Sequence, residues 1–382
     1  MFMMRNLLFL PLAIFIFGSV SAQSSIDNEK LLDLYQNQRY TDATEYLENV
    51  YKQDSLGSKE LSQLAYAYKM AGKLPKAEET YQKLRNLDSA NMPVLFNLAE
   101  INSRRGNAAS ARKYYMDILK LDSTNFNMYK ELAALSKNEP DVKRLTYLQK
   151  ANEINNTDAD VAFDLAELYF KSNLFDKANN ALTPAIAADS ANLQLLKMKM
   201  PISLATKNYS EAIEMGNKLL SYGDSSSFVL NNLGKSYYLT LDYQNALKSF
   251  LAVKQKTGEG EALYFNIARS YRGIKDYKNA VVYLQKTISE AVSPSVASYY
   301  GLLGDSFENI DKNEDANKAY KKGLDFENDG SLLYNIALVY ETKLSDKKNA
   351  ITYYEQYLKT VDKTKQAKLV KYINTKIEEL KR

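Results

Sequence analysis

The chain has 382 residues, and its 50 lysines and arginines nearly balance 46 aspartates and glutamates, for a net charge of +4. It contains no cysteine and no histidine, which excludes disulfide bonds, catalysis by imidazole or thiolate, and the usual zinc, copper and haem ligands. The positive charges are interspersed with negative ones instead of clustering, so nucleic-acid binding is not expected. We also expect no cofactor and no metal.

Residues 1–22 have the pattern of a secretory signal peptide. Arg5 precedes an apolar run over residues 7–17, and Val20-Ser21-Ala22 forms a small-residue cleavage site before Gln23. The alternative, a retained membrane anchor, is disfavoured because the run is short for spanning a bilayer. We therefore expect a periplasmic or secreted protein with no membrane span after cleavage. The Tyr-, Asn- and Lys-rich composition resembles that of exported Bacteroidetes proteins.

An alanine recurs along the chain with a period close to 34 residues. The steps between successive alanines are 34, 34, 67, 34, 34, 34, 36 and 34, and the step of 67 contains one further unit around Arg144. This period is the length of one supersecondary unit, so about ten units in a row predict a stacked array. The alanines are Ala43, Ala77, Ala111, Ala178, Ala212, Ala246, Ala280, Ala316 and Ala350.

In eight of the ten units a second landmark stands 11 to 13 residues before the periodic position, where a small residue follows Leu or Ile, as in Leu233-Gly234 and Ile267-Ala268. An aromatic residue usually stands three positions beyond the small one, and a large residue stands four beyond the alanine. Offsets of three and four place side chains on one helix face. Each unit is therefore predicted to be two short amphipathic helices, A and B.

The segments between helices contain turn-forming residues. Gly72 and Gly106 are predicted to end helix A with a positive φ. Between units, the Asp-Ser pairs at residues 88–89, 122–123 and 189–190 are expected to cap the next helix. These pairs, and Asp54-Ser55, also resemble the Asp-Ser/Thr sites used for O-glycosylation in Bacteroidetes, which leaves modification as a second interpretation.

The pattern resembles the tetratricopeptide repeat, whose signature places Leu-Gly and Tyr in helix A and Ala and Phe in helix B. The resemblance covers residues 27–361, although no Trp is present and Ser, Asp or Asn replaces the proline between units. It implies an all-α solenoid, a right-handed superhelix of about ten helix-turn-helix repeats over residues 23–361. In the family, helix A lines a concave groove that binds a peptide or a partner's helix.

Two units depart from the pattern. The unit around Arg144 has Pro140 in its turn and lacks the alanine, and the sixth unit has Pro201 inside its helix A. Proline removes a backbone donor, so we expect this helix to be kinked or cut short, with a change in the path of the array near residues 193–209.

Residues 362–382 form one more predicted amphipathic helix, with Leu369, Ile373, Ile377 and Leu380 on one face. Because the end of a solenoid exposes an apolar face, we interpret this segment as a C-terminal capping helix. The alternative is a partner-binding tail.

An asparagine stands two residues before the small residue in several units, and the resemblance implies that it faces the groove. Its amide offers both a donor and an acceptor to an extended peptide. Cations follow the small residue in units seven and eight and are expected near the same groove, where they would suit a carboxylate. The predicted partner-binding residues are Asn97, Asn232, Lys235, Asn266, Arg269, Arg272 and Asn335.

The sequence therefore favours a non-catalytic scaffold or adaptor of the cell envelope, with a protein or peptide partner in its concave groove. The alternative is a binder of cell-surface glycan or peptidoglycan, which tyrosines gathered on the concave surface would favour. An enzyme is not expected: acidic pairs such as Glu78-Glu79 point apart on a helix, and Gly258-Glu259-Gly260 is interpreted as a turn and not as a phosphate-binding loop.

Overall fold

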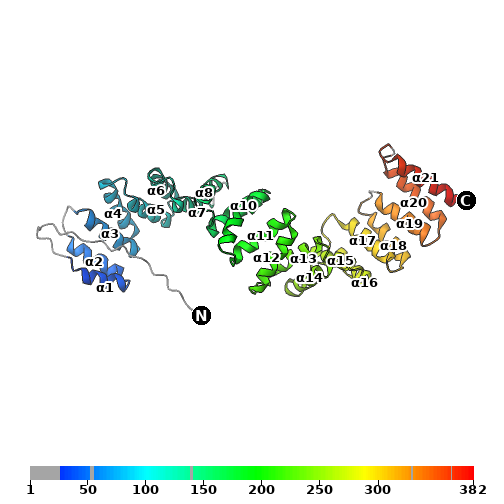
Figure 1. Cartoon of the computed structure of the whole chain (residues 1–382), viewed down its shortest axis with the longest axis horizontal. Helices are drawn as coiled ribbons and strands as arrows, with labels where there is room; N and C mark the ends of the chain where they lie inside the picture. Colours follow the sequence, from blue (N-terminus) through cyan, green and yellow to red (C-terminus); the bar gives the residue numbers. More distant parts are fainter. Residues whose placement is uncertain (1–25, 52–55, 138–140, 328–329, 363) are drawn as a thin grey trace. The chain divides into compact units, whose positions relative to one another are not determined.

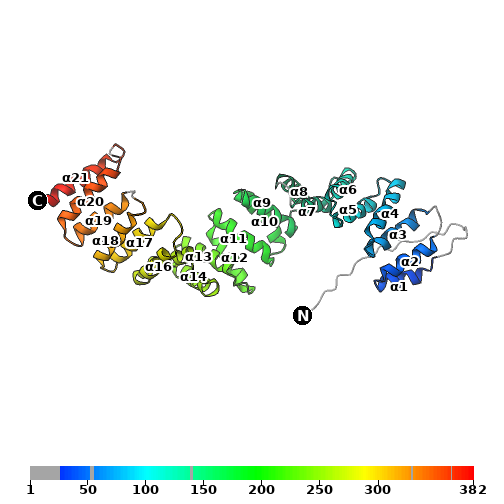
Figure 2. The same cartoon turned by 180° about the vertical axis from the view of Figure 1, so that it is seen from behind.

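The computed structural model describes residues 26–51, 56–137, 141–327, 330–362 and 364–382, with the side chain of Asp141 excepted. The predicted signal peptide lies outside these residues. The described part is helical and contains no strand: ten helical hairpins are followed by one further helix, as Figure 1 and, from behind, Figure 2 show. None of these helices is long and apolar enough to cross a membrane.

The chain divides into two compact units, Met1–Tyr147 and Leu148–Arg382, and the division falls inside helix α8. The first unit contains the first three hairpins and α7. Its helices are α1 (Asn28–Gln36), α2 (Tyr40–Val50), α3 (Ser58–Met70), α4 (Leu74–Leu87), α5 (Met92–Arg104), α6 (Ala108–Leu121), α7 (Phe126–Leu135) and the first half of α8 (Asp141–Ile154).

The second unit continues from α8 with six more hairpins and the last helix. From α1 to α20, odd-numbered helices are the A helices and even-numbered ones the B helices, and α21 is the further helix. The helices of the second unit are α9 (Ala159–Lys171), α10 (Phe175–Ala188), α11 (Leu193–Ala205), α12 (Tyr209–Ser221), α13 (Ser227–Leu239), α14 (Tyr243–Thr257), α15 (Glu261–Gly273), α16 (Tyr277–Ser289), α17 (Val296–Glu308), α18 (Asn313–Gly323), α19 (Ser331–Thr342), α20 (Lys347–Thr360) and α21 (Ala367–Lys381).

The periodic residues form the core of each hairpin. All nine alanines lie on B helices and are fully buried, and the large residues four positions beyond eight of them are buried as well. The small residue of helix A faces these large side chains: a Cβ added to Gly234 would lie 2.6 Å from Cε1 of Phe250. The prediction of paired amphipathic helices joined by small-to-large packing is confirmed.

The turn between helices A and B has the same backbone conformation in nine hairpins. The residue five positions before each periodic alanine has a left-handed φ of 54–78°. Glycine occupies this position at Gly72 and Gly106, as predicted. The other seven turns use Gln38, Asn173, Lys207, Leu241, Lys275, Asp311 and Ser345.

The capping predicted for the Asp-Ser pairs is wrong. Asp88 ends α4, and its Oδ1 accepts a bond from the N–H of Ala90 at 3.0 Å, closing a local turn. The helix that follows is capped by Asn91, whose Oδ1 accepts from the N–H of Val94, and Asn192 caps α11 in the same way. Ser89, Ser123 and Ser190 are exposed in these turns, and their modification stays a prediction; Ser55 lies outside the described residues.

The prediction that Pro201 shortens its helix is also wrong. Helix α11 runs without interruption from Leu193 to Ala205, the same length as α9, α13 and α15. Met200 and Ile202, on either side of the proline, are fully buried, and their packing holds the helical backbone in place of the lost hydrogen bond. A change in the path of the array near residues 193–209 stays a prediction.

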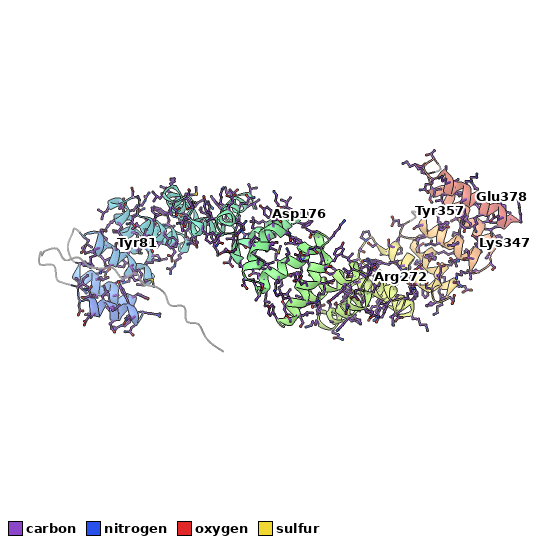
Figure 3. The ribbon with its side chains drawn as sticks, in the orientation of Figure 1. Tyr81, Asp176, Arg272, Lys347, Tyr357 and Glu378 are labelled. Carbon is purple, nitrogen blue, oxygen red and sulfur yellow. The ribbon has the colours of Figure 1, made fainter. Side chains whose placement is uncertain are left out.

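The last helix, α21, packs against α20 through Ile373 and Ile377, which are buried beside Tyr354 and Ala337. Lys376 of α21 also forms an ion pair with Glu341 of α19 at 2.6 Å. Tyr357 on α20 and Glu378 on α21 are labelled in Figure 3.

Candidate functional site

A pocket of about 500 Å³ lies on the A helices α11, α13 and α15 of the second unit. We call it the groove pocket. It brings together four of the seven predicted partner-binding residues, because the same positions of successive A helices face the same side. Its lining consists of Pro201, Leu204, Ala205, Asn232, Lys235, Tyr238, Leu239, Phe250, Asn266 and Arg269.

Two polar side chains of the groove pocket are available to a ligand. Lys235 is exposed and Asn266 half-buried, and neither side chain has a hydrogen bond or ion pair within the described residues. Asn232 is more constrained: its Nδ2 donates to the carbonyl of Phe228 at 2.8 Å. The pocket therefore offers one complete amide, one amide oxygen and one unpaired ammonium group.

Arg269 is held in place by an aromatic ring. Its guanidinium lies 4.2 Å from the ring centroid of Tyr238, and its Nε donates to the hydroxyl of Tyr238 at 3.1 Å. The guanidinium carbon Cζ of Arg269 also lies 5.4 Å from the ring centroid of Phe265. Stacking and the single bond through Nε fix the plane of the guanidinium and leave its terminal nitrogens to donate elsewhere.

The remaining wall of the groove pocket is apolar. Pro201 and Leu204 come from α11, and Leu239, which is 46% exposed, comes from the end of α13. No acidic residue lines this pocket. A pocket with two cations, free amide groups and an apolar wall is suited to a segment that carries both a carboxylate and an apolar side chain.

Arg272 and Asn335 lie in a different pocket. They line a cavity of about 440 Å³ on α15, α17 and α19, and Figure 3 labels Arg272. Arg272 forms an ion pair with Asp305 of α17, and Glu327 lies on the same lining. The carboxylates already present make this cavity less receptive to an anion than the groove pocket.

Asn97 belongs to the first unit. It lines a pocket of about 410 Å³ on α5 and α7. Its Nδ2 donates to the carbonyl of Pro93 at 2.8 Å, and its Oδ1 accepts from Nζ of Lys69 at 2.7 Å. Both ends of this amide are therefore engaged within the first unit.

Tyr238, Leu239 and Leu204 also line the groove pocket and are not among the residues predicted from the sequence. Tyr238 occupies the position four beyond the small residue, the position that Arg272 occupies in the next unit. The repeat register therefore contained a signal for Tyr238. The contribution of Leu204 depends on the uninterrupted helix beyond Pro201, which the sequence did not predict.

Comparison with known families finds two matches. A family model described as "Tetratricopeptide repeat" matches residues 262–291 and 330–360, which correspond to α15–α16 and α19–α20. A second model, "Domain of unknown function (DUF7017)", matches residues 94–227. No curated protein matches the chain.

Several solved structures are similar to parts of this chain. The crystal structure of YrrB, described as a TPR protein with an unusual peptide-binding site, shows 19% identity and a TM-score of 0.43, and covers 48% of this chain and 94% of its own. MamA from Desulfovibrio magneticus RS-1 shows 18% identity and a TM-score of 0.41 over 44% of this chain and 94% of its own. A tetratricopeptide repeat protein from Parabacteroides merdae ATCC 43184 shows 18% identity and a TM-score of 0.35 over 74% of this chain and 98% of its own.

The matched segments contain two of the ten helical hairpins, and the same buried alanine, small-to-large contact and left-handed turn recur in hairpins outside those segments. Residues 262–291 and 330–360 are therefore tetratricopeptide repeats, and the described part of the chain is an all-α solenoid of the same kind of hairpin.

Proposed function

We propose that this protein is a non-catalytic scaffold of the cell envelope that binds an acidic, extended segment of a partner protein in the groove pocket. Tetratricopeptide arrays present extended concave surfaces for binding, so protein interaction is the general function of the family. The choice of an acidic segment follows from the residues of the groove pocket.

The observation that carries the proposal is the pairing of free polar groups with positive charge in one pocket. Asn266 can donate to and accept from a peptide backbone, while Lys235 and the oriented guanidinium of Arg269 receive a carboxylate. The exposed side chain of Leu239 supplies apolar contact beside them. Because no acid lines the pocket, the incoming carboxylate meets no like charge.

The assignment to the cell envelope is supported by residues 1–22, whose charged, apolar and small-residue segments follow the order of a signal peptide. Cleavage before Gln23 would release the array outside the cytoplasm. The N-terminal sequence of the protein purified from its native host tests this assignment directly.

The alternative function, glycan or peptidoglycan binding, has less support. Sugar-binding surfaces expose aromatic rings, whereas only Tyr66, Tyr222 and Tyr372 of the 30 tyrosines are largely exposed. These three lie on α3, at the end of α12 and on α21. The other tyrosines are buried or half-buried, which favours a protein partner.

The proposal is tested by capturing the partner from native envelope extract, identifying its acidic segments by mass spectrometry, and measuring the affinity of the corresponding peptides. The variant Asn266→Ala/Arg269→Glu removes the amide and reverses one charge, and we expect it to bind about 10- to 100-fold more weakly. Lys235→Glu should act similarly, and its exposed side chain has no packing role. Lys248→Glu, exposed on α14 outside the pocket, is the matched control.

Circular dichroism establishes that each variant is folded. Unchanged affinity in a folded double variant excludes the groove pocket as the peptide site. Capture of soluble peptidoglycan fragments, abolished by the same variant, would instead support the glycan alternative.

A further inference from the structure

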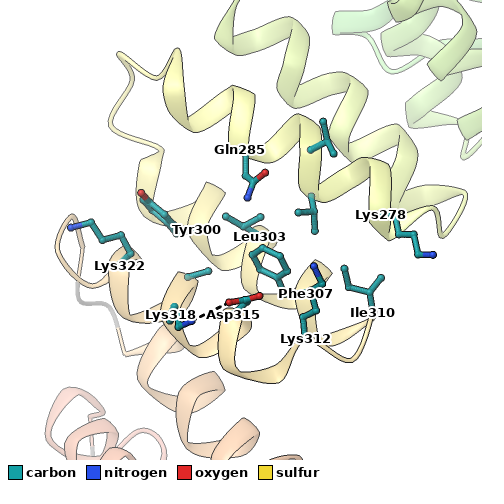
Figure 4. A pocket seen from close by; sticks show the side chains of 13 residues that line it. Lys278, Gln285, Tyr300, Leu303, Phe307, Ile310, Lys312, Asp315, Lys318 and Lys322 are labelled. Atoms are coloured by element: carbon teal, nitrogen blue, oxygen red, sulfur yellow. Dashed lines mark hydrogen bonds and ion pairs between the residues drawn. The ribbon is translucent and has the colours of Figure 1, made fainter.

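A second cavity of the second unit, larger than the groove pocket, lies outside it. It has a volume of about 780 Å³ and is formed by α16, α17 and α18. Figure 4 shows the side chains that line it, with α17 residues between those of the two B helices. We call it the lysine-rimmed pocket, after Lys278, Lys312, Lys318 and Lys322 at its edge.

This pocket opens on the side of α17 opposite to the cavity that contains Arg272. Tyr300, Leu303 and Phe307 of α17 face the lysine-rimmed pocket, whereas Leu302 and Asp305 line the cavity that contains Arg272. Positions two residues apart on a helix differ by about 200°. One helix therefore separates two distinct surfaces, and occupation of one does not obstruct the other.

The charges around the lysine-rimmed pocket are unbalanced. Four lysines line it against one acid, Asp315, and that acid already pairs with Lys318 at 3.2 Å. Lys322 forms an ion pair at 2.7 Å with Asp325, which does not line the pocket. Lys278 and Lys312 form no ion pair within the described residues. Two cations are thus free to receive negative charge from a ligand.

The interior of the pocket is apolar. Val281, Leu303 and Phe307 form its buried floor, and Val282, which is 45% exposed, and the half-buried Ile310 extend the apolar surface toward the rim. Aliphatic surface between free ammonium groups is complementary to a ligand with an apolar face and acidic flanks. A helix lying in a groove between two helices presents its side chains in this way.

We propose that the lysine-rimmed pocket is a second docking site, and that it binds an acidic amphipathic helix of a partner protein. A small anion would gain little there, because the lysines are exposed and ion pairs with exposed side chains are weak. A helix adds burial of its apolar side chains to several such pairs. The site lets the scaffold hold one partner in the groove pocket and another in the lysine-rimmed pocket, because the two pockets share no lining residue.

The test uses the mature chain, Gln23 to Arg382, and a fluorescein-labelled peptide of about 14 residues with Leu on one helical face and Glu on the other. Binding is followed by fluorescence anisotropy. One control peptide replaces every Glu by Gln and another replaces every Leu by Ala. We expect binding that weakens at least tenfold with either control peptide and that weakens with added salt.

The decisive variant is Lys278→Glu/Lys312→Glu, which reverses the two unpaired cations without breaking an ion pair. We expect it to bind the Glu/Leu peptide at least tenfold more weakly, and Val282→Asp to weaken binding by removing exposed apolar surface. Lys248→Glu/Lys368→Glu makes the same change of net charge at exposed sites elsewhere and should bind normally. Asn266→Ala/Arg269→Glu should also bind normally, because it alters only the groove pocket.

Equal loss in the two double-lysine variants would overturn the proposal, because it would reveal attraction to net charge alone. Loss only in Asn266→Ala/Arg269→Glu would assign the peptide to the groove. Binding of vesicles containing phosphatidylglycerol that Lys278→Glu/Lys312→Glu abolishes, with peptide binding unchanged, would assign the pocket to a lipid surface. If the groove-pocket variants bind their peptide with unchanged affinity, the proposed function fails. The test of the lysine-rimmed pocket still stands, because it uses different residues.

Discussion

The ring of Tyr320 on α18 occupies the space that a Cβ on Gly304 of α17 would need. Tyr320 is 1% exposed and donates its hydroxyl to Glu308, so the ring cannot swing away without losing both contacts. Burial raises the pKa of Tyr320 far above its ordinary value, and the hydrogen bond from its hydroxyl to Glu308 raises it further. The pair Gly234 and Phe250 repeats the arrangement in another hairpin.

Gly304→Ala should therefore destabilise the protein although alanine favours helix. Overpacking against a fixed ring costs about 1–3 kcal/mol, which exceeds the gain of about 1 kcal/mol in helix propensity. Gly301→Ala, one turn earlier on α17, is the control, since its nearest atom would be Leu332 Cδ2 at 3.3 Å. In urea denaturation, we expect the midpoint of Gly304→Ala to lie below the wild-type midpoint. The midpoint of Gly301→Ala should lie at the wild-type midpoint or above it.

Glu261 ties the start of α15 to the connection before α17. Its carboxylate accepts bonds from the backbone N–H of Val292 and Ser293 and from the hydroxyl of Tyr299. Ser293 and Tyr299 side chains together with these N–H groups lower the pKa of Glu261 from 4.5 to about 2. The charged form is thus favoured in the folded protein.

Because this pKa is lowered on folding, its stabilising effect is fully present above about pH 5, declines as the pH falls from 4.5, and is absent below about pH 2. Glu261→Gln should remove this part of the pH dependence and speed hydrogen exchange at residues 292–293. The measurement is thermal denaturation between pH 2 and pH 7 with exchange mass spectrometry. A wild-type and a variant curve that run parallel would contradict the prediction.

Leu241 is the least suitable of the side chains found in the left-handed turns. Its φ is 65°, and its side chain is 69% exposed, so little packing offsets the steric cost. Leu241→Gly should stabilise the protein by about 0.5–1 kcal/mol, the balance between relieved strain and added unfolded-state entropy. Asn173→Gly should be close to neutral, because Asn tolerates this conformation. A melting temperature that falls in Leu241→Gly would disprove the argument.

Lys199 is a buried cation on α11. Its Nζ lies 3.1 Å from Oε1 of Glu211 and contacts Oδ1 of Asn179, while Oγ of Ser203 donates to Oε2 of Glu211. Lys199→Met keeps the volume but leaves the Glu211 carboxylate with fewer partners, so we expect a loss of about 1–3 kcal/mol. Lys199→Met/Glu211→Gln should recover part of that loss. Equal midpoints for wild type and Lys199→Met would show that the ion pair does not stabilise the fold.

The fold was predictable because its determinants are local and repeated. The spacing of Ala246 and Phe250 places both on one face of a helix, and Gly234 opposite Phe250 follows the same register in other units. The turns were predicted only where glycine marks them, because Leu241 and Lys275 adopt left-handed φ values that their side chains do not favour. The helix beyond Pro201 was missed because burial of Ile202 outweighs a local penalty.

The sites were less predictable because they depend on neighbouring helices. Asn266 and Lys235 share a pocket since the repeat places them at successive A-helix positions. The ion pair between Arg272 and Asp305 could not be read from either helix alone. The lysine-rimmed pocket has no motif: Lys278 and Lys312 lie on different elements, and only the packing of α16, α17 and α18 brings them to one rim.

Within the second unit, the contacts of each helix are mainly with the helices just before and after it in the chain. Under a pulling force such an array is expected to yield hairpin by hairpin, since opening one hairpin disturbs only its immediate neighbours. Re-formation needs no distant segments to meet, so it is expected to be fast. The array of the second unit would therefore lengthen under force and shorten again when the force is released. A partner bound to an undisturbed hairpin would stay bound meanwhile.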